Sequence, residues 1–308
     1  MIACECSNHL ARSLEAPRRV NHLPDFIEHF EPLSQNYDVL LCDVWGVIHN
    51  GVAAFAPAWD ALLRFRKSGG TAILITNAPR PGDSVARILD RLAVPRQAYD
   101  AITSSGDTTR GIVASRRGQR LFHLGPERDV PIFAGLELTF APLETADYVV
   151  CSGLFDDTVE TPETYRDMLA AMRQRSLFMV CANPDIMVER GDALVYCAGA
   201  LADAYVALGG DVLYCGKPHA PIYQAALAAA AAARGAAAVP LERVLAIGDS
   251  VRTDLKGAAA FGIDSVFVTS GIHAEEYGGR HTPDIEALDS IFAAGGVTPI
   301  AVTRGLKW

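Results

Sequence analysis

The sequence lacks long hydrophobic runs, although half of its 308 residues are hydrophobic. No apolar stretch approaches the roughly 18 residues that a membrane-spanning helix needs, so we expect no membrane partner. Residues 1–30 are polar and carry Glu5 early, without the apolar stretch of a secretory signal. We therefore expect a cytoplasmic protein whose residues 1–30 form a leader with one or two short helices.

Positive charge is also scarce. The 27 Lys and Arg residues are outnumbered by 36 Asp and Glu residues, which gives a formal net charge of −9. This balance argues against nucleic acid as a partner, because an acidic surface repels its phosphates. An acidic protein that binds a phosphorylated molecule must build a local positive site from a metal ion, Lys side chains and backbone N–H groups.

The seven cysteines are odd in number and scattered along the chain, so they do not predict a framework of disulfide bonds. Cys4 and Cys6 form a lone Cys-x-Cys, whereas zinc sites need four clustered ligands, so a zinc site there is disfavoured. Four others lie in apolar runs typical of buried strands: Cys42, Cys151, Cys181 and Cys215. We interpret them as reduced, buried thiols, as expected in the cytoplasm.

From Tyr37 onward, short apolar runs alternate with helical patterns. Val39–Cys42 and Thr71–Ile75 are continuous apolar runs, as expected for central parallel strands. Helical patterns follow them over Trp59–Lys67 and Gly82–Ala93. Repeated strand–helix order predicts an α/β fold with a parallel sheet and right-handed crossovers.

A separate strand–helix–strand set interrupts this alternation and predicts an inserted domain. Its elements are expected over Asp147–Cys151, Pro162–Arg173 and Leu177–Cys181. Core-like elements then return over Val212–Tyr214, Pro221–Arg234, Val244–Ile247 and Ser265–Val268. We predict a core from residues 1–117 plus 210–308 and an inserted domain from residues 118–209.

Asp43 ends the first apolar run and opens a turn that contains Gly46. Open α/β sheets place their active sites at the carboxyl ends of strands, and a buried carboxylate there needs a compensating partner. A carboxylate can attack phosphorus to form an aspartyl-phosphate, and it can bind Mg²⁺. Asp43 is therefore a candidate nucleophile and metal ligand. The alternative is an Asp that only makes a turn.

Asp249 and Asp254 follow a later strand. Asp249 could supply a second carboxylate to the metal, while Asp254 could orient Asp249 or hold a metal-bound water. The alternative is an N-cap followed by an acidic first helical turn.

Lys217 and Thr76-Asn77 follow two further strands. A Lys side chain can neutralise both a nucleophilic carboxylate and a phosphate oxygen. A hydroxyl with backbone N–H groups near a helix start can bind phosphate. The alternatives are a surface-loop lysine and a plain turn. The nearby Arg80 could add charge to the site entrance, but we expect it to be only a solvated loop residue.

In order and spacing, these four strand ends resemble the haloacid dehalogenase superfamily, in particular its class IIA branch of NagD-like and 4-nitrophenyl-phosphatase-like hydrolases. The segment Asn183-Pro184-Asp185 also resembles one found in that branch. The resemblance covers about residues 37–272. It implies a Rossmann-like parallel-sheet core with an inserted α/β cap of the C2 type, and possible pairing of two chains as a homodimer.

The resemblance also implies a Mg²⁺ ion held by Asp43, the backbone carbonyl of Trp45 and Asp249. Relatives carry a second Asp two residues after the nucleophile, which protonates the leaving oxygen. Trp45 stands there instead, and its indole N–H only donates hydrogen bonds. Losing a positioned acid–base group costs about 10²–10⁴ in rate. The enzyme could then act on esters with good leaving groups, recruit another group such as His49, or bind without turnover.

We therefore predict a Mg²⁺-dependent phosphohydrolase that acts on a small phosphorylated metabolite through an aspartyl-phosphate on Asp43. Lys217 would act in catalysis, and Thr76, Asn77 and Lys217 would bind the phosphate. A phospholigand-binding protein with little turnover is the alternative. A haloacid dehalogenase-type reaction ranks lower, because Lys217 with Asp249 and Asp254 suits Mg²⁺ and phosphate. In the inserted domain, Asp157 and Asp185 follow strands and could touch the substrate; Asp157 could equally cap a helix.

Overall fold

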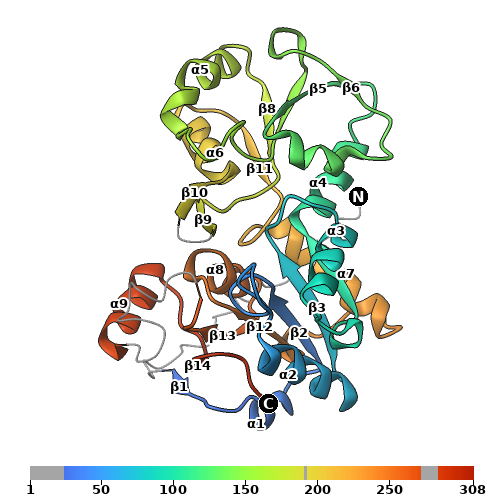
Figure 1. Ribbon diagram of the computed structural model, residues 1–308, viewed down its shortest axis with the longest axis vertical. Helices are drawn as coiled ribbons and strands as arrows, with labels where there is room; N and C mark the ends of the chain where they lie inside the picture. The colour runs from blue at the N-terminus through green and yellow to red at the C-terminus, as the bar shows by residue number, and fades with distance from the viewer. Residues whose placement is uncertain (1–23, 191–192, 272–283) are drawn as a thin grey trace, which may run out of the picture.

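The computed structural model describes residues 24–190, 193–271 and 284–308. They form two α/β units, one above the other along the long axis of the molecule (Figure 1). Most of the predicted leader, residues 1–23, lies outside the described residues, and its described end holds a short strand, Asp25–Phe26, instead of a helix. None of the helices described is both long and apolar enough to cross a membrane.

The lower unit is built on a seven-stranded sheet in which all neighbouring strands are parallel. Its central strands are buried on both faces, which explains why they are continuous apolar runs in the sequence. In spatial order the strands are β1 (Asp25–Phe26), β14 (Ala301–Thr303), β13 (Asp264–Val268), β12 (Val244–Gly248), β2 (Val39–Asp43), β3 (Thr71–Thr76) and β4 (Ala101–Ser104).

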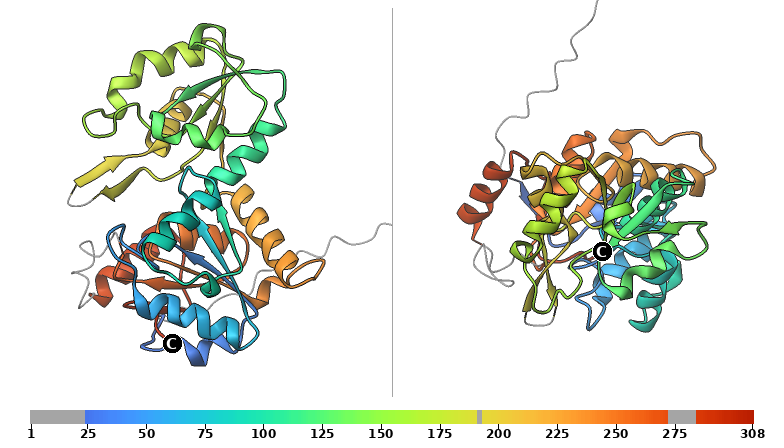
Figure 2. Two further views of the ribbon diagram at one scale, coloured as in Figure 1. Left: turned by 45° about the vertical axis from the view of Figure 1, so that its right-hand side comes forward. Right: turned by 90° about the horizontal axis from the view of Figure 1, so that it is seen from above.

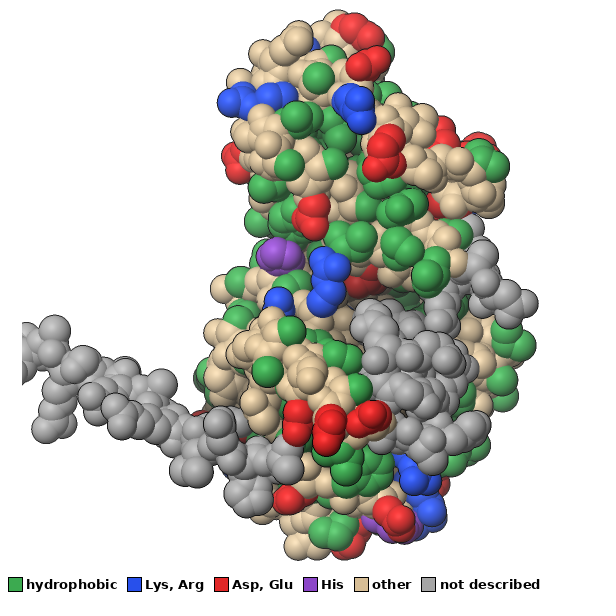
Figure 3. All heavy atoms as spheres, turned by 90° about the vertical axis from the view of Figure 1, so that its left-hand side faces the viewer, with side chains coloured by type: hydrophobic (Ala, Val, Ile, Leu, Met, Phe, Trp, Pro, Cys, Tyr) green, Lys and Arg blue, Asp and Glu red, His purple; other side chains and the backbone are tan. Residues whose placement is uncertain are grey.

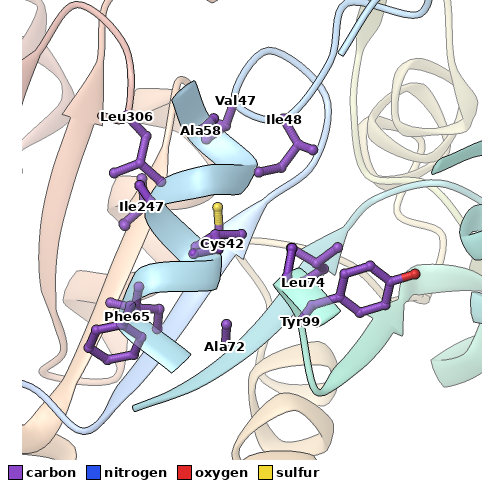
Figure 4. Packing of buried hydrophobic residues seen from close by; sticks show 14 of the residues in the cluster. Cys42, Val47, Ile48, Ala58, Phe65, Ala72, Leu74, Tyr99, Ile247 and Leu306 are labelled. Carbon is purple, nitrogen blue, oxygen red and sulfur yellow. The ribbon is translucent and has the colours of Figure 1, made fainter. Parts of the chain in front are cut away.

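Helices cover both faces of this sheet. On one face, α2 (Ala56–Lys67) lays Ala58 and Phe65 against side chains of β2 and β3 such as Cys42 and Leu74 (Figure 4). Long and short apolar side chains interdigitate there as in a close-packed interior. The other helices of this unit are α1 (Glu31–Ser34), α3 (Gly82–Arg91), α4 (Ser105–Ala114), α7 (Ala220–Ala233), α8 (Lys256–Ala260) and α9 (Ile285–Gly295). Of these, α7 packs on the opposite face.

The predicted helices are present with shifted ends. Helix α2 begins at Ala56, earlier than predicted, because Pro57 fits the first turn, where its missing N–H is not needed. Short helical turns link the remaining elements: η1 (Arg96–Ala98), η2 (Glu127–Phe133), η3 (Leu143–Thr145), η4 (Pro162–Tyr165), η5 (Leu241–Arg243) and η6 (Val251–Leu255).

The upper unit has a five-stranded parallel sheet and a separate hairpin. The sheet order is β11 (Val212–Tyr214), β8 (Phe178–Cys181), β7 (Tyr148–Cys151), β5 (Arg120–Leu124) and β6 (Thr139–Phe140). Helices α5 (Arg166–Gln174) and α6 (Ala198–Ala207) pack on one face. The antiparallel hairpin of β9 (Met187–Arg190) and β10 (Ala193–Tyr196) lies on the side of the upper unit that faces the lower unit (Figures 1 and 2).

The predicted α/β class with a Rossmann-like core is confirmed. One assignment is wrong: Val212–Tyr214 belongs to the upper sheet, where it pairs with β8, and not to the core. A three-residue apolar strand fits either sheet by composition, and only the open edge of β8 decides its place. We propose that the upper unit is the inserted cap, bounded near residue 117 and after Tyr214 instead of at 209.

Candidate active site

Three neighbouring core strands bring the predicted site residues to one edge. Strand β2 ends at Asp43, β3 ends at Thr76, and Asp249 directly follows β12. Because β2 lies between β12 and β3 and all three are parallel, their carboxyl ends meet, as predicted.

The two units meet at a waist, where basic and acidic side chains lie beside hydrophobic ones (Figure 3). A cavity of about 280 Å³ lies between the core edge and the cap. The core lines it with all the predicted site residues except Asp254. The cap adds polar side chains to the lining: Arg128, Asp129, Ser152, Asp157, Asn183, Asp185 and Tyr196.

Lys217 joins two carboxylates at the base of the cavity. Its Nζ lies 2.6 Å from Asp43 Oδ1 and 2.7 Å from Asp254 Oδ1, and all three residues are buried. Although burial alone would lower it, the pKa of Lys217 is raised well above its usual value by Asp254 and Asp43. Lys217 is therefore a buried ammonium and not a surface-loop lysine.

Three buried carboxylates cluster around this ammonium. One oxygen of each of Asp43, Asp249 and Asp254 lies within 4.8 Å of the others. Burial raises the pKa of Asp43, and it raises that of Asp254 to about 6, in both cases against the pull of Lys217. A single ammonium cannot balance three carboxylates, and hard divalent cations prefer such oxygen donors. The donor set fits a divalent cation.

Asp254 does more than the sequence suggested. Beyond its contact with Lys217, its Oδ2 accepts a hydrogen bond from the backbone N–H of Ser250 at 3.2 Å. A Cβ at Gly248 would lie 2.1 Å from Asp254 Cγ, so only glycine lets the chain pass here. Asp254 thus holds Lys217 in place as well as adding negative charge to the cluster.

Asn77 has a structural task that its sequence position did not reveal. Its Oδ1 accepts a hydrogen bond from the Lys217 backbone N–H at 2.6 Å, and its Nδ2 donates to the Lys217 carbonyl at 3.0 Å. The same Nδ2 donates to Asp185 Oδ1 of the cap at 2.9 Å. The Asn77 side chain therefore fixes the Lys217 loop and a cap loop. Thr76 lies at the cavity wall, as predicted.

Trp45 and His49 line the cavity wall together with Asp43. The Trp45 indole is 36% exposed and meets His49 edge-on, with ring centroids 5.2 Å apart. His49 Nδ1 accepts a hydrogen bond from the Gly51 backbone N–H at 2.9 Å, so the ring hydrogen sits on Nε2. Burial lowers the pKa of His49 to about 4. At neutral pH His49 is thus a neutral imidazole whose Nδ1 is already hydrogen-bonded.

Two contacts between charged side chains lie at the cavity wall. Arg80 Nε lies 3.9 Å from the buried Asp129 Oδ1, while the Arg80 side chain itself stays 40% exposed, so this loop residue also brings positive charge to the cavity wall. Within the cap, Arg128 forms an ion pair with Asp157. Arg128 and Asp129 could not be predicted as site residues from the sequence, because neither belongs to a recognisable motif. Asp157 lines the cavity.

Comparisons with known proteins identify the family. The family model for haloacid dehalogenase-like hydrolases matches residues 40–139, and a second, HAD-hydrolase-like model matches residues 214–294. A crystal structure of a hydrolase of the haloacid dehalogenase-like family from Brucella suis 1330 is 47% identical. It has a TM-score of 0.80 and covers 91% of this chain and 100% of that chain. The chain belongs to the haloacid dehalogenase-like hydrolases. The predicted resemblance is confirmed, and the two matched stretches contain Asp43, Thr76, Lys217, Asp249 and Asp254.

Two more distant relatives have named activities. The curated 5'-nucleotidase YutF of Bacillus subtilis is 24% identical over 263 residues, which cover 83% of this hydrolase and 97% of the relative. A crystal structure of glycerol phosphate phosphatase from Mycobacterium tuberculosis in complex with calcium is 25% identical, with a TM-score of 0.59. It covers 78% of this hydrolase and 68% of that chain.

Gly46 packs directly against Asp249 of the carboxylate cluster, so a larger residue at position 46 tests how closely the cluster is packed. Gly46 has φ 83°, and a Cβ there would lie 2.0 Å from Asp249 Oδ2. We expect Gly46→Ala to displace Asp249 and to weaken divalent-cation binding at least about tenfold, because a misplaced ligand loses coordination geometry. Isothermal titration with Mg²⁺ measures this.

Gly69→Ala is the matched control. Gly69 also has a positive φ, 98°, but a Cβ there would meet nothing within 4 Å. It should cost about 1 kcal/mol of stability through backbone strain and leave cation affinity unchanged. Equal cation affinity in Gly46→Ala and Gly69→Ala would contradict the role assigned to Asp249.

Proposed function

We propose that this hydrolase removes the phosphoryl group from a small phosphomonoester in a Mg²⁺-dependent reaction through an aspartyl-phosphate on Asp43. The observation that carries the proposal is the position of Asp43. Its carboxylate touches a buried ammonium, belongs to a cluster of three carboxylates and faces a cavity under the cap. The names of relatives, a 5'-nucleotidase, a D-glycerol 3-phosphate phosphatase and an acid sugar phosphatase, support a phosphorylated metabolite as the substrate class.

Each residue of the site would have its own role in the transfer of the phosphoryl group. Asp43 attacks the phosphorus, and Lys217 balances the charge of Asp43 and of a phosphate oxygen. The Thr76 hydroxyl and the Asn77 backbone N–H bind the remaining oxygens. A Mg²⁺ ion held by Asp43, Asp249 and the backbone carbonyl of Trp45 would supply Lewis-acid stabilisation of the transferring phosphoryl group.

The cap contributes by excluding water. Its contacts with the core, from Asp185 to Asn77 and from Asp129 to Arg80, hold the cap next to the cavity that Asp43 lines. A closed, water-poor cavity strengthens the attraction between Lys217 and the phosphate. Opening and closing of the cap would admit the substrate and release the product.

Removal of metal tests the cofactor. Treatment with a chelator should lower phosphate release from p-nitrophenyl phosphate at least about 100-fold, since three buried carboxylates would then repel the substrate phosphate. Readdition of Mg²⁺ should restore the rate, which phosphate release during a titration measures. Full activity in the chelator, with no metal found by elemental analysis, would contradict a metal-dependent reaction.

A second candidate is a phospholigand-binding protein with little turnover, which Trp45 favours because it removes the acid of the family pattern. This candidate predicts no phosphate release together with thermal stabilisation by a phosphorylated ligand. That gain would be about 2.7 kcal/mol at a ligand concentration of 100 Kd. A dehalogenase reaction, the third candidate, predicts halide release without added metal, which the carboxylate cluster disfavours.

A further inference from the structure

Because position 45 is a Trp, the proposed reaction needs another group to act as its general acid. When Asp43 displaces an alkoxide from phosphorus, the leaving oxygen must gain a proton, and Trp45 has none to give. A replacement acid must line the same cavity and face the reacting phosphate. Outside the carboxylate cluster, the imidazole and carboxyl groups that line the cavity are those of His49, Asp129, Asp157 and Asp185 among the described residues.

Three of these four groups are occupied elsewhere. His49 is neutral and its Nδ1 is bonded to the Gly51 backbone. Asp157 forms an ion pair with Arg128, which favours its charged form. Asp129 is also buried, which raises its pKa, but it lies beside Arg80, and the positive charges of Arg128 and Arg80 act against that rise.

Asp185 is held next to the reaction centre by a continuous chain of contacts. Its Oδ1 accepts from Asn77 Nδ2 at 2.9 Å, Asn77 bonds both sides of the Lys217 backbone, and Lys217 Nζ touches Asp43. The adjacent Pro184 packs so closely that a Cβ on Gly216 would lie 2.6 Å from its Cδ. The cap loop therefore rests directly on the phosphate-binding loops.

The second oxygen of Asp185 is available for a proton. Among the described residues, Oδ1 takes the bond from Asn77, Oδ2 makes no hydrogen bond, and the side chain forms no ion pair. The backbone N–H of Asp185 donates to Asn183 Oδ1 at 3.0 Å, which fixes the loop. A carboxyl group with one anchored and one unoccupied oxygen, facing a cavity, can carry and release a proton.

The surroundings of Asp185 also favour its protonated form. Burial raises the pKa of Asp185, and the charge of Asp254 adds to this, while Asn77, Lys217 and Arg252 oppose it. Burial raises the pKa of Asp43, and the charge of Asp185 adds a smaller contribution in the same direction. A raised pKa moves a carboxyl group toward the range in which it can act as an acid near neutral pH.

We propose that Asp185 of the cap, in place of the residue at position 45, is the general acid and base of this hydrolase. The inference rests on the proposed phosphatase function. As Asp43 forms its bond to phosphorus, the ester P–O bond breaks and the leaving oxygen takes the proton from Asp185 Oδ2. The Asp185 carboxylate then takes a proton from the water that attacks the aspartyl-phosphate, which releases phosphate and restores both groups. Catalytic competence thereby depends on cap closure.

The test compares two leaving groups. The variant Asp185→Asn keeps an oxygen that can accept from Asn77 Nδ2 but cannot donate an acidic proton. With glycerol 3-phosphate, whose alkoxide needs a proton, kcat should fall about 10²–10⁴-fold. With p-nitrophenyl phosphate, whose leaving phenolate is stable, the fall should be at least about tenfold smaller, because only the second half-reaction then needs the base.

Two further variants separate chemistry from structure. Asp129→Asn removes a carboxylate from the same cavity, and the ratio of its rates on the two substrates should match that of the wild type. Adding Trp45→Asp to Asp185→Asn should raise kcat on glycerol 3-phosphate at least about tenfold above that of Asp185→Asn alone. The added Asp places an acid in the same cavity wall.

The outcomes separate the inference from the function on which it rests. Equal losses on both substrates in Asp185→Asn, or no rescue by Trp45→Asp, would show that Asp185 only holds the cap and would overturn the inference. A wild-type enzyme that releases phosphate from p-nitrophenyl phosphate but not from glycerol 3-phosphate would also overturn it, while leaving the phosphatase function intact. No Asp43-dependent release from either substrate would overturn the proposed function itself.

Discussion

Asp43→Asn is expected to lower phosphate release at least about 10⁴-fold, because an amide cannot attack phosphorus and form an acyl-phosphate. The amide is nearly isosteric with the carboxylate and the site is buried, so the fold should be retained. Removing one of three clustered negative charges also relieves repulsion, so the thermal stability of the metal-free variant should equal or exceed that of the wild type. Phosphate release from p-nitrophenyl phosphate and a thermal melt measure the two effects.

Asp38→Asn is the matched control for this change. Asp38 directly precedes β2, at the opposite end from Asp43, and forms an ion pair with Arg243 on the surface. Its replacement should leave kcat within about twofold of the wild type, because the interaction is far along the strand from the site and surface ion pairs contribute about 0–1 kcal/mol. Intact phosphatase activity in Asp43→Asn would refute the nucleophile assignment. A wild type without activity, yet stabilised by a phosphorylated ligand, would favour the binding-protein alternative.

Lys217→Met should lower both activity and stability. Methionine matches the length of the lysine stem but leaves Asp43 and Asp254 facing each other without the ammonium between them. Removing one partner of a buried ion pair costs about 3–5 kcal/mol. Loss of one charge-stabilising donor to the transition state should reduce kcat about 10²–10³-fold.

The stability loss in Lys217→Met should depend on pH in a defined direction. The pKa of Asp254 is raised from 3.8 to about 6, so the folded state binds this proton more tightly than the unfolded state. Without metal, stability therefore falls as the pH rises from about 4 to about 6, and it falls further when Lys217 is absent. The difference between wild type and variant should be small near pH 4 and largest above about pH 7, as melts across that range would show.

Lys256→Met provides the control for charge alone. Lys256 begins α8 close to the site in sequence, and its side chain is exposed. Its replacement should change stability by less than about 0.5 kcal/mol at any of these pH values. A Lys217→Met variant as stable as Lys256→Met at neutral pH would contradict the buried charge network.

The sequence predicted the residues of the site because parallel strands impose a simple rule. A buried strand is a continuous apolar run, and polar residues that follow neighbouring parallel strands meet at one edge. Asp43, Thr76 and Asp249 satisfy this rule, and the structure places them together. Lys217 was predicted as a site residue because clustered carboxylates need a compensating cation.

Local sequence patterns could not predict contacts between segments that are far apart in the chain. The bond from Asn77 to Asp185 spans 108 residues, and that from Lys217 to Asp254 spans 37. Nothing in either segment distinguishes a capping Asp from one that holds a buried lysine or meets an amide of another unit. The same reason explains β11, whose short apolar run fits either sheet.

The sequence by itself determined the α/β class, the strands of the core sheet and the chemistry available at their ends, since burial and periodicity are local properties of the chain. Tertiary structure alone decided which groups those end residues touch. It turned the Asn77 side chain to the Lys217 loop, fixed the His49 tautomer through Gly51, and brought Asp185 of the cap to the cavity. Hydrogen bonds and desolvation depend on neighbours that are close in space and not in sequence, and these neighbours set the charge state of each group.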